Sequence, residues 1–228
     1  MKKHVFKTGF KVAVIIAVLA IGLVLDPTAI EHPLIKSVRE KIGYNPRIGL
    51  GSFPIDPKFV LDRRIEQWGA DLGINRDDLL RTKARIAPLP MGCPPGSTGC
   101  FAASYHAYGA IKDGTIYLAP EILQRDLLEQ RATLAHEYLH YVWFISSESE
   151  RNRLTPYLNI VYGQHKAAFD QRTASYHHRG VLPGSTDFTD ELHSFIGTEL
   201  HDSLLPPELL GWYTKWLPNR QALPNYLK

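Results

Sequence analysis

Residues 133–142 read TLAHEYLHYV and place two histidines, His136 and His140, four positions apart, with Glu137 directly after the first. Apolar residues recur at spacings of three and four from residue 127 to residue 145, which predicts one helix across this region. Residues four apart lie on the same face of a helix, about one turn from each other. Two imidazoles in this arrangement can bind one metal ion, and Zn2+ commonly takes such nitrogen ligands.

The other residues of segment 133–142 are uncharged, so we expect the segment to be buried. Burial of two histidines and a glutamate is costly unless they are paired or bind a metal. Two hydrogen-bonded core histidines are the alternative to a metal site. The presence of Glu137 favours a catalytic metal site over this alternative. A carboxylate beside a metal ligand can take a proton from water and pass it to a leaving amine.

With its uncharged frame, TLAHEYLHYV resembles the extended HExxH motif of the zincin metallopeptidases, and the resemblance covers mainly residues 114–202. It implies an α+β fold with a small, mostly antiparallel sheet, an active-site helix and several further helices. It also implies zinc-dependent hydrolysis of a peptide or protein substrate, with Glu137 as the catalytic residue. An edge strand along the cleft is expected to pair with extended substrate, and residues 114–119 are the candidate.

Catalytic zinc needs a third protein ligand and one open position. The motif continues as YVWFISS over residues 141–147, which lacks the glycine and third histidine of the metzincins. The gluzincins take a glutamate from a later helix instead. Three downstream glutamates are less suitable, because they lie close to the motif or at a helix start: Glu148, Glu150 and Glu208.

The helix expected over residues 187–204 leaves Glu191 and Glu199. In several gluzincins a small residue follows the ligand glutamate by three positions, as Ser194 follows Glu191. Periodicity places Glu199 near the centre of the apolar face and Glu191 at its edge, where a side chain can point into a cleft. We therefore expect His136, His140 and Glu191 to bind the metal. Glu199 would orient a ligand histidine or act as an alternative ligand.

Two points leave this assignment open. A glutamate in the first turn of a helix also stabilises that helix, which is another explanation for Glu191. The segment between residues 146 and 187 is longer than in the best-known gluzincins. The residue that stabilises the oxyanion is not chosen by spacing from these candidates: Tyr105, Tyr176, His177, His178, His193 and His201.

The N-terminus has the layout of a secretory signal, with basic residues up to Lys11 and an uncharged apolar run over residues 12–25. The run is shorter than the roughly 20 residues of a spanning helix, and it lacks a clean cleavage site. Residues 1–25 are thus expected to be a signal peptide or a signal anchor, residues 26–55 a linker, and residues 56–228 the peptidase domain. The protein is expected to be extracytoplasmic: secreted, periplasmic, or anchored in the membrane by residues 12–25.

The two cysteines, Cys93 and Cys100, stand in a segment rich in glycine and proline. In an oxidising compartment this spacing favours a disulfide that closes a small loop. A pair of metal ligands is the alternative, but it would need two more nearby ligands, and only His106 is close.

The remaining patterns predict further elements. They are a helix over 57–72 with Pro57 in its first turn, a helical turn at 77–81, a strand-like block at 82–87, a hairpin over 101–119, helices over 157–176 and 187–204, and a short last helix through residue 216.

The net charge of +3 owes much to the lysines of the N-terminus, and nothing in the sequence indicates nucleic-acid binding. Two alternatives to a peptidase remain open. One is a non-catalytic envelope protein in which the same residues bind a metal or a partner. The other is a hydrolase of non-protein amide bonds in the cell wall.

Overall fold

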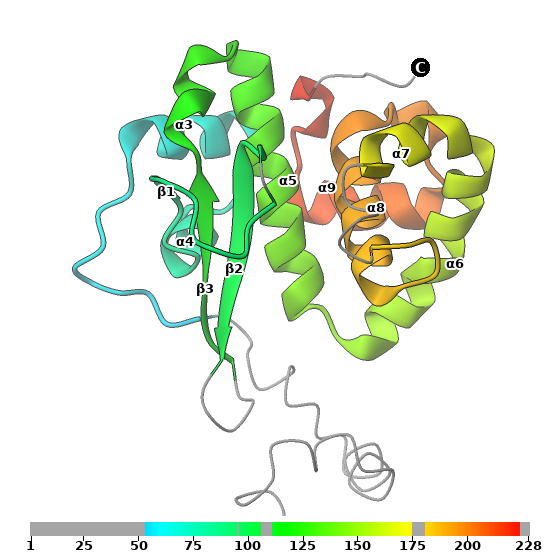
Figure 1. Ribbon diagram of the computed structural model, residues 1–228, viewed down its shortest axis with the longest axis horizontal. Coiled ribbons are helices and arrows are strands. Elements are labelled where there is room, and N and C mark those ends of the chain that lie inside the picture. The colour runs from blue at the N-terminus through cyan, green and yellow to red at the C-terminus, as the bar shows by residue number, and fades with distance from the viewer. Residues whose placement is uncertain (1–52, 95, 106–110, 175–180, 224–228) are drawn as a thin grey trace, which may run out of the picture.

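The computed structural model describes residues 53–94, 96–105, 111–174 and 181–223 (Figure 1). The elements in chain order are α3 (Arg63–Leu72), α4 (Arg76–Arg81), β1 (Arg85–Ile86), β2 (Gly99–Tyr105), β3 (Ile111–Leu118), η3 (Pro120–Gln124), α5 (Leu127–Ile145), α6 (Glu148–Gln164), α7 (Lys166–Thr173), α8 (Thr186–Glu199), η5 (Asp202–Leu204), α9 (Pro207–Trp216) and η6 (Arg220–Ala222). Figure 1 shows α5 between the sheet and the group of helices α6 to α9. The fold is α+β with a small sheet, as expected.

The three strands form a mixed sheet in the order β1-β3-β2. The β2–β3 pair is the predicted hairpin; it is antiparallel, with Gly99 opposite Leu118. β1 pairs with β3 in parallel, with Arg85 opposite Tyr117. The expectation that residues 114–119 form an edge strand is therefore wrong, because β1 covers the other side of β3. The edge beside α5 belongs to β2.

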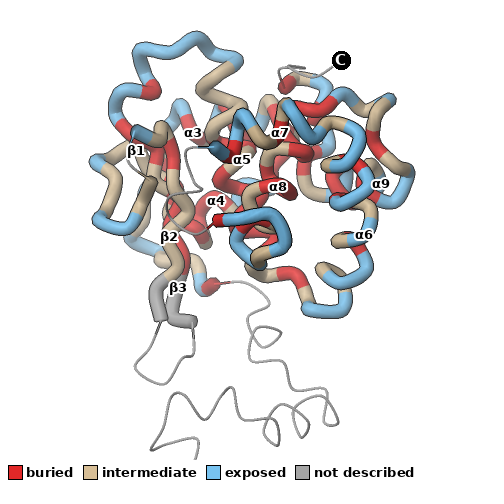
Figure 2. The backbone as a smooth tube through the Cα atoms, turned by 45° about the vertical axis from the view of Figure 1, so that its right-hand side comes forward, coloured by how far each residue is buried: buried red, intermediate tan, exposed pale blue. Residues whose placement is uncertain are grey.

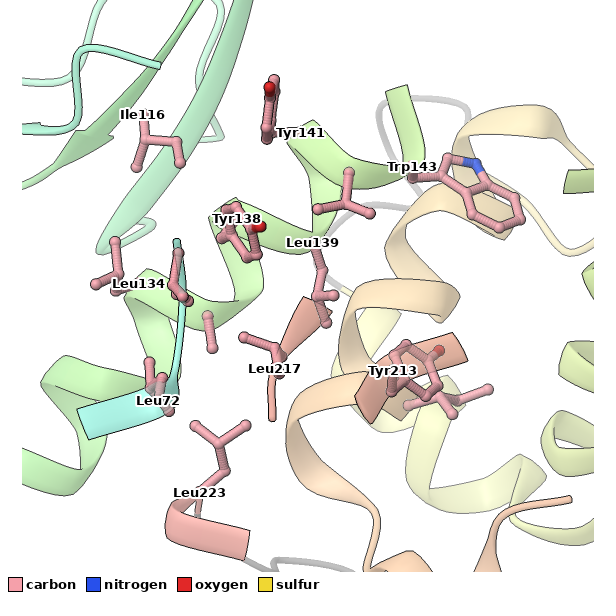
Figure 3. Packing of buried hydrophobic residues seen from close by; sticks show 14 of the residues in the cluster. Leu72, Ile116, Leu134, Tyr138, Leu139, Tyr141, Trp143, Tyr213, Leu217 and Leu223 are labelled. Atoms are coloured by element: carbon pink, nitrogen blue, oxygen red, sulfur yellow. The ribbon is translucent and has the colours of Figure 1, made fainter. Parts of the chain in front are cut away.

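Helix α5 has the predicted bounds. The Asp126 side chain caps its start by accepting a hydrogen bond from the backbone N–H of Glu129. Leu134 and Leu139 are fully buried, and α5 contacts β2 and β3 on one side and α8 on the other. Figure 3 shows these side chains with Ile116 of β3 in one apolar cluster. Buried residues gather along α5 and α8, while exposed residues lie at the periphery (Figure 2).

Helix α8 is shorter than the predicted helix over residues 187–204. Ser185, rather than Asp187, caps its start, and α8 ends at Glu199. The reason lies in a later element, because the buried guanidinium of Arg220 donates to the carbonyls of Gly197 and Leu200. These bonds satisfy carbonyl groups at the end of α8 that would otherwise lack partners.

Two other predicted helices begin elsewhere. The helix predicted over residues 57–72 starts only at Arg63, because the Asp62 side chain provides the cap. The helix predicted over residues 157–176 is two helices, α6 and α7. α6 starts at Glu148 with Pro156 in its interior. Ser147 accepts a hydrogen bond from the Glu150 N–H, and this capping-box pattern is the stronger start signal.

The predicted signal segment at residues 1–25, and the predicted linker up to residue 52, lie outside the described residues. Phe53 is already buried in the core, against Tyr141 and Phe144 of α5. Within the described ranges, no helix is both long and apolar enough to cross a bilayer.

Leu139 provides a test of the packing of α5. Leu139→Ala should lower the free energy of unfolding by about 2–5 kcal/mol, because it empties a fully buried position between α5 and α8. Leu128→Ala on the same helix is the control, since Leu128 is 41% exposed, and it should cost less than about 0.5 kcal/mol. Urea denaturation measures both. Equal losses in the two variants would contradict the described packing.

Candidate metal centre

Helices α5 and α8 bring three candidate ligands together. The Nε2 atoms of His136 and His140 lie 3.1 Å apart, and each lies 3.6 Å from Oε2 of Glu191. A tetrahedral zinc ion with bonds of about 2.1 Å requires roughly 3.4 Å between donor atoms. Among the described residues, these three form the one cluster of ligating side chains with a spacing that suits a metal ion.

The environment of Glu191 also fits a cation. Its Oε2 atom is buried and has no hydrogen-bond partner, although a buried carboxylate oxygen normally has one. Burial alone would raise the pKa of Glu191, but His140 and His136 outweigh it and hold the pKa well below its ordinary value. The carboxylate is therefore charged and aimed at the two imidazoles, as a ligand would be.

Asp190 fixes the orientation of His140. Its Oδ1 atom lies 2.9 Å from Nδ1 of His140, which places a proton on Nδ1 and leaves Nε2 free to bind a metal. Burial lowers the pKa of His140, but the carboxylates of Asp190 and Glu191 raise it well above its ordinary value. Asp190 was not among the residues predicted for the site. The available signal was an acidic residue directly before the candidate ligand.

Glu199 does not belong to the cluster of three ligands, although it lines the first cavity together with His136. Its Oε2 atom accepts a hydrogen bond of 2.9 Å from Nε of Arg172, which is its hydrogen-bonding partner among the described residues. Burial raises the pKa of Glu199, and the Arg172 charge opposes this rise. The structure thus brings Glu191, and not Glu199, to the histidines. The hydrogen bond of Glu199 is to Arg172, while His136 acts on the pKa of Glu199 through its charge.

Glu137 is buried between α5 and β2. Burial raises its pKa, while His136, His140 and a hydrogen bond from the backbone of Phe101 act in the opposite direction. A buried carboxylate beside the candidate ligands is placed to accept and return a proton.

Two cavities meet at this centre, with volumes of about 340 Å3 and 270 Å3. Gly99, His136 and Glu137 line both of them. The first extends to Arg125, Glu129, Ile122, Arg172, Phe195 and Glu199, and the second to Pro94, Cys100, Phe101, Asp187, Asp190 and Glu191.

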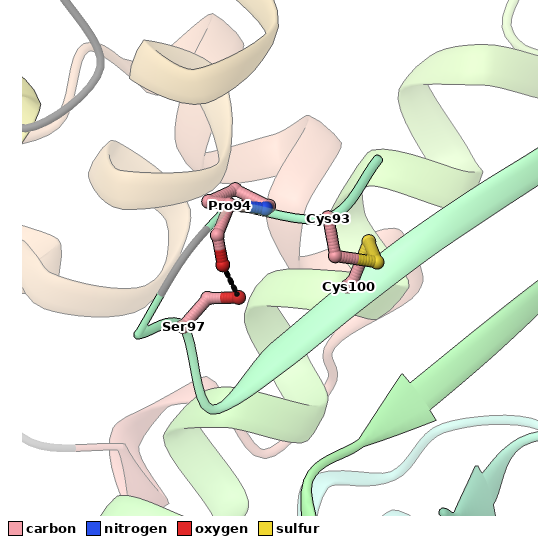
Figure 4. The surroundings of a disulfide bond; sticks show 4 residues. All are labelled: Cys93, Pro94, Ser97 and Cys100. Carbon is pink, nitrogen blue, oxygen red and sulfur yellow. Dashed lines mark hydrogen bonds between the residues drawn. A yellow bond between two sulfur atoms is a disulfide. The ribbon is translucent and has the colours of Figure 1, made fainter. Parts of the chain in front are cut away.

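The predicted disulfide between Cys93 and Cys100 is confirmed, and it closes the loop that leads into β2 (Figure 4). Within the loop, the Ser97 hydroxyl donates to the carbonyl of Pro94 at 2.8 Å. Pro94 and Cys100 line the second cavity, while Ser97 and Gly99 line the first. The closed loop is therefore a wall of both cavities.

Two candidates for oxyanion stabilisation, His193 and His201, line neither cavity. His193 is fully buried and stacks on Trp143, with 4.5 Å between ring centroids. His201 is exposed and bonds Ser203. The side chains of the other four candidates lie outside the described part of the chain: Tyr105, Tyr176, His177 and His178.

Comparison of the chain with known proteins finds no matching family model, curated protein or solved structure.

Metal content tests the ligand set. His140→Ala and Glu191→Ala should lose most of the bound zinc, because each removes one of three donors. Glu199→Ala should keep near-full occupancy. Asp190→Asn should weaken zinc binding by about 10- to 100-fold, because it loosens a ligand histidine. Mass spectrometry of the purified variants measures occupancy. Full zinc in Glu191→Ala, or loss in Glu199→Ala, would overturn the assignment.

The disulfide should contribute to stability. Its two cysteines are separated by seven positions, and closure of such a short loop is worth about 2–3 kcal/mol. The double variant Cys93→Ser, Cys100→Ser should lose that free energy of unfolding in urea denaturation, and reduced wild type should behave in the same way. An unchanged midpoint in both samples would show that the loop is held by other contacts.

Proposed function

We propose that this chain is a zinc-dependent metallopeptidase of the zincin type, most similar to the gluzincins. The observation that carries the proposal is the cluster of His136, His140 and Glu191 with the buried carboxylate of Glu137 beside it. A structural zinc site uses four protein ligands and has no open coordination position. Three protein ligands beside a cavity leave the fourth position open for water or substrate. Two cavities meet at this position.

The residues suit hydrolysis of an amide bond. Zinc bound by His136, His140 and Glu191 would polarise the scissile carbonyl and lower the pKa of a water molecule. The carboxylate of Glu137 takes a proton from the attacking water while the oxygen of that water bonds to the carbonyl carbon. Glu137 then delivers this proton to the amine nitrogen as the carbon–nitrogen bond breaks. The burial that raises the pKa of Glu137 favours such a shuttle.

β2 is an edge strand of the sheet formed by the described residues, which supports an extended peptide as substrate. In an antiparallel pair, alternate residues direct their backbone groups toward the partner strand. The Thr98 carbonyl accepts from the Ala119 N–H, so the backbone groups of Gly99 and Phe101 face the other way. The effect of the Phe101 backbone on the pKa of Glu137 agrees with this direction. An extended chain can pair with this edge beside the metal centre.

The Cys93–Cys100 disulfide supports an extracytoplasmic location, because disulfides persist mainly in oxidising compartments. Secretion, a periplasmic location or anchoring through residues 12–25 would each place the domain there.

Glu137→Gln tests the proposal. It keeps the shape of the side chain and removes the proton acceptor, so hydrolysis should fall by at least about 100-fold while zinc remains bound. Cleavage of a broad peptide library and zinc content are the measurements. Glu121→Gln is the control, since Glu121 is exposed and outside both cavities, and it should keep full activity.

Wild-type protein that binds zinc but cleaves neither peptides nor cell-wall fragments would contradict catalysis and favour a metal-binding role. Cleavage of wall fragments alone would keep the metal chemistry and refute the peptide substrate.

A further inference from the structure

Gly99, the first residue of β2, lies directly against the carboxylate of Glu137. A Cβ atom at this position would lie 2.7 Å from both Cγ and Oε1 of Glu137, and 2.8 Å from Cγ2 of Thr133. These distances are shorter than van der Waals contact. The side chains of Glu137 and Thr133 therefore occupy the space that a side chain at position 99 would need, and a glycine there lets the strand approach them.

The start of β2 has little freedom to move away from α5. The backbone carbonyl of Thr98 accepts a hydrogen bond from the Ala119 N–H at 2.9 Å. The Thr98 hydroxyl lies 3.3 Å from the hydroxyl of Thr133, one turn before Glu137 on α5. Cys100, on the other side of Gly99, is held by the disulfide to Cys93.

Glu137 also has a second residue of the same strand beside it. The backbone of Phe101, two residues after Gly99, is close enough to the Glu137 carboxylate to lower its pKa. One backbone segment thus approaches the carboxylate at both residues. Because the segment is fixed on either side of Gly99, an added methyl group would displace the flexible Glu137 side chain rather than the strand.

We propose that Gly99 is a positioning residue for the reaction: its lack of a side chain lets the edge of β2 hold the Glu137 carboxylate in the place from which it exchanges protons with water and the leaving amine. This inference rests on the proposed function. It assigns Gly99 no role in metal binding, since the nearest atoms belong to Glu137 and Thr133 and not to a ligand histidine.

Gly99→Ala is the central test, with Gly211→Ala as the matched control. Gly211 is exposed on α9, and a Cβ there would meet nothing within 4 Å. In the zinc-loaded protein, Gly99→Ala should lower kcat by about 10- to 100-fold, because a displacement of about 1 Å in a reacting group has such an effect. KM should stay within about twofold and zinc content should not change. Gly211→Ala should match wild type in all three measurements.

A double-mutant cycle on thermal stability tests the contact without any substrate. Gly99→Ala should lower Tm by about 5 °C, because it overpacks a filled site. In the Glu137→Ala background the same change should cost less than half as much, because two of the three crowded atoms are gone. Equal costs in both backgrounds would show that Gly99 does not act through Glu137.

The outcomes separate this inference from the function on which it rests. A Gly99→Ala protein with wild-type kcat, or one whose loss of kcat follows loss of zinc, would overturn the role of Gly99 and leave the peptidase intact. A wild-type protein without hydrolytic activity would refute the function and the catalytic role together. The stability cycle would then still decide whether Gly99 and Glu137 are in contact.

Discussion

Helix α5 places two imidazoles and a carboxylate on the same turns that fill the hydrophobic core. Leu139 and Val142 are fully buried within the same turns as His136, Glu137 and His140. Isolated charges in such a place cost several kcal/mol, so the polar side of the helix must meet complementary groups. Acidic residues of α8 and the backbone of β2 supply them. The centre depends on how closely these two elements approach α5.

Small residues permit the approach of α8. A Cβ at Gly197 would lie only 2.4 Å from Cδ1 of Leu139, and Ser194 is fully buried. These positions follow Glu191 by six and three residues, so they lie along the same helix as the candidate ligand. Close packing of the two helices therefore brings the carboxylate of Glu191 within 3.6 Å of both histidines. A small residue also permits the close approach of β2, because Gly99 lies directly against α5.

Local signals in the sequence were sufficient for the elements that depend on neighbouring residues. The bounds of α5 follow from its periodicity, and the Cys93–Cys100 bond follows from spacing and composition. Features set by distant residues were not predictable in this way. The end of α8 depends on Arg220, and the place of residues 114–119 inside the sheet depends on pairing with β1.

The same distinction holds within the candidate centre. Helical spacing places His136 and His140 one turn apart on α5, with Glu137 next to the first, and the edge position of Glu191 agrees with its place beside the two histidines. The partner of Glu199 depends on how α7 packs against α8, and that packing leaves no trace in the spacing of either helix.

Phe53 gives the domain a mechanical property. Its ring packs on Tyr141 and Phe144 at the end of α5, and its carbonyl accepts a hydrogen bond from Arg81. The described fold therefore starts on the helix that carries the histidines. A pulling force on the chain before Phe53 would be transmitted to α5 through these two aromatic contacts and to α4 through the Arg81 hydrogen bond.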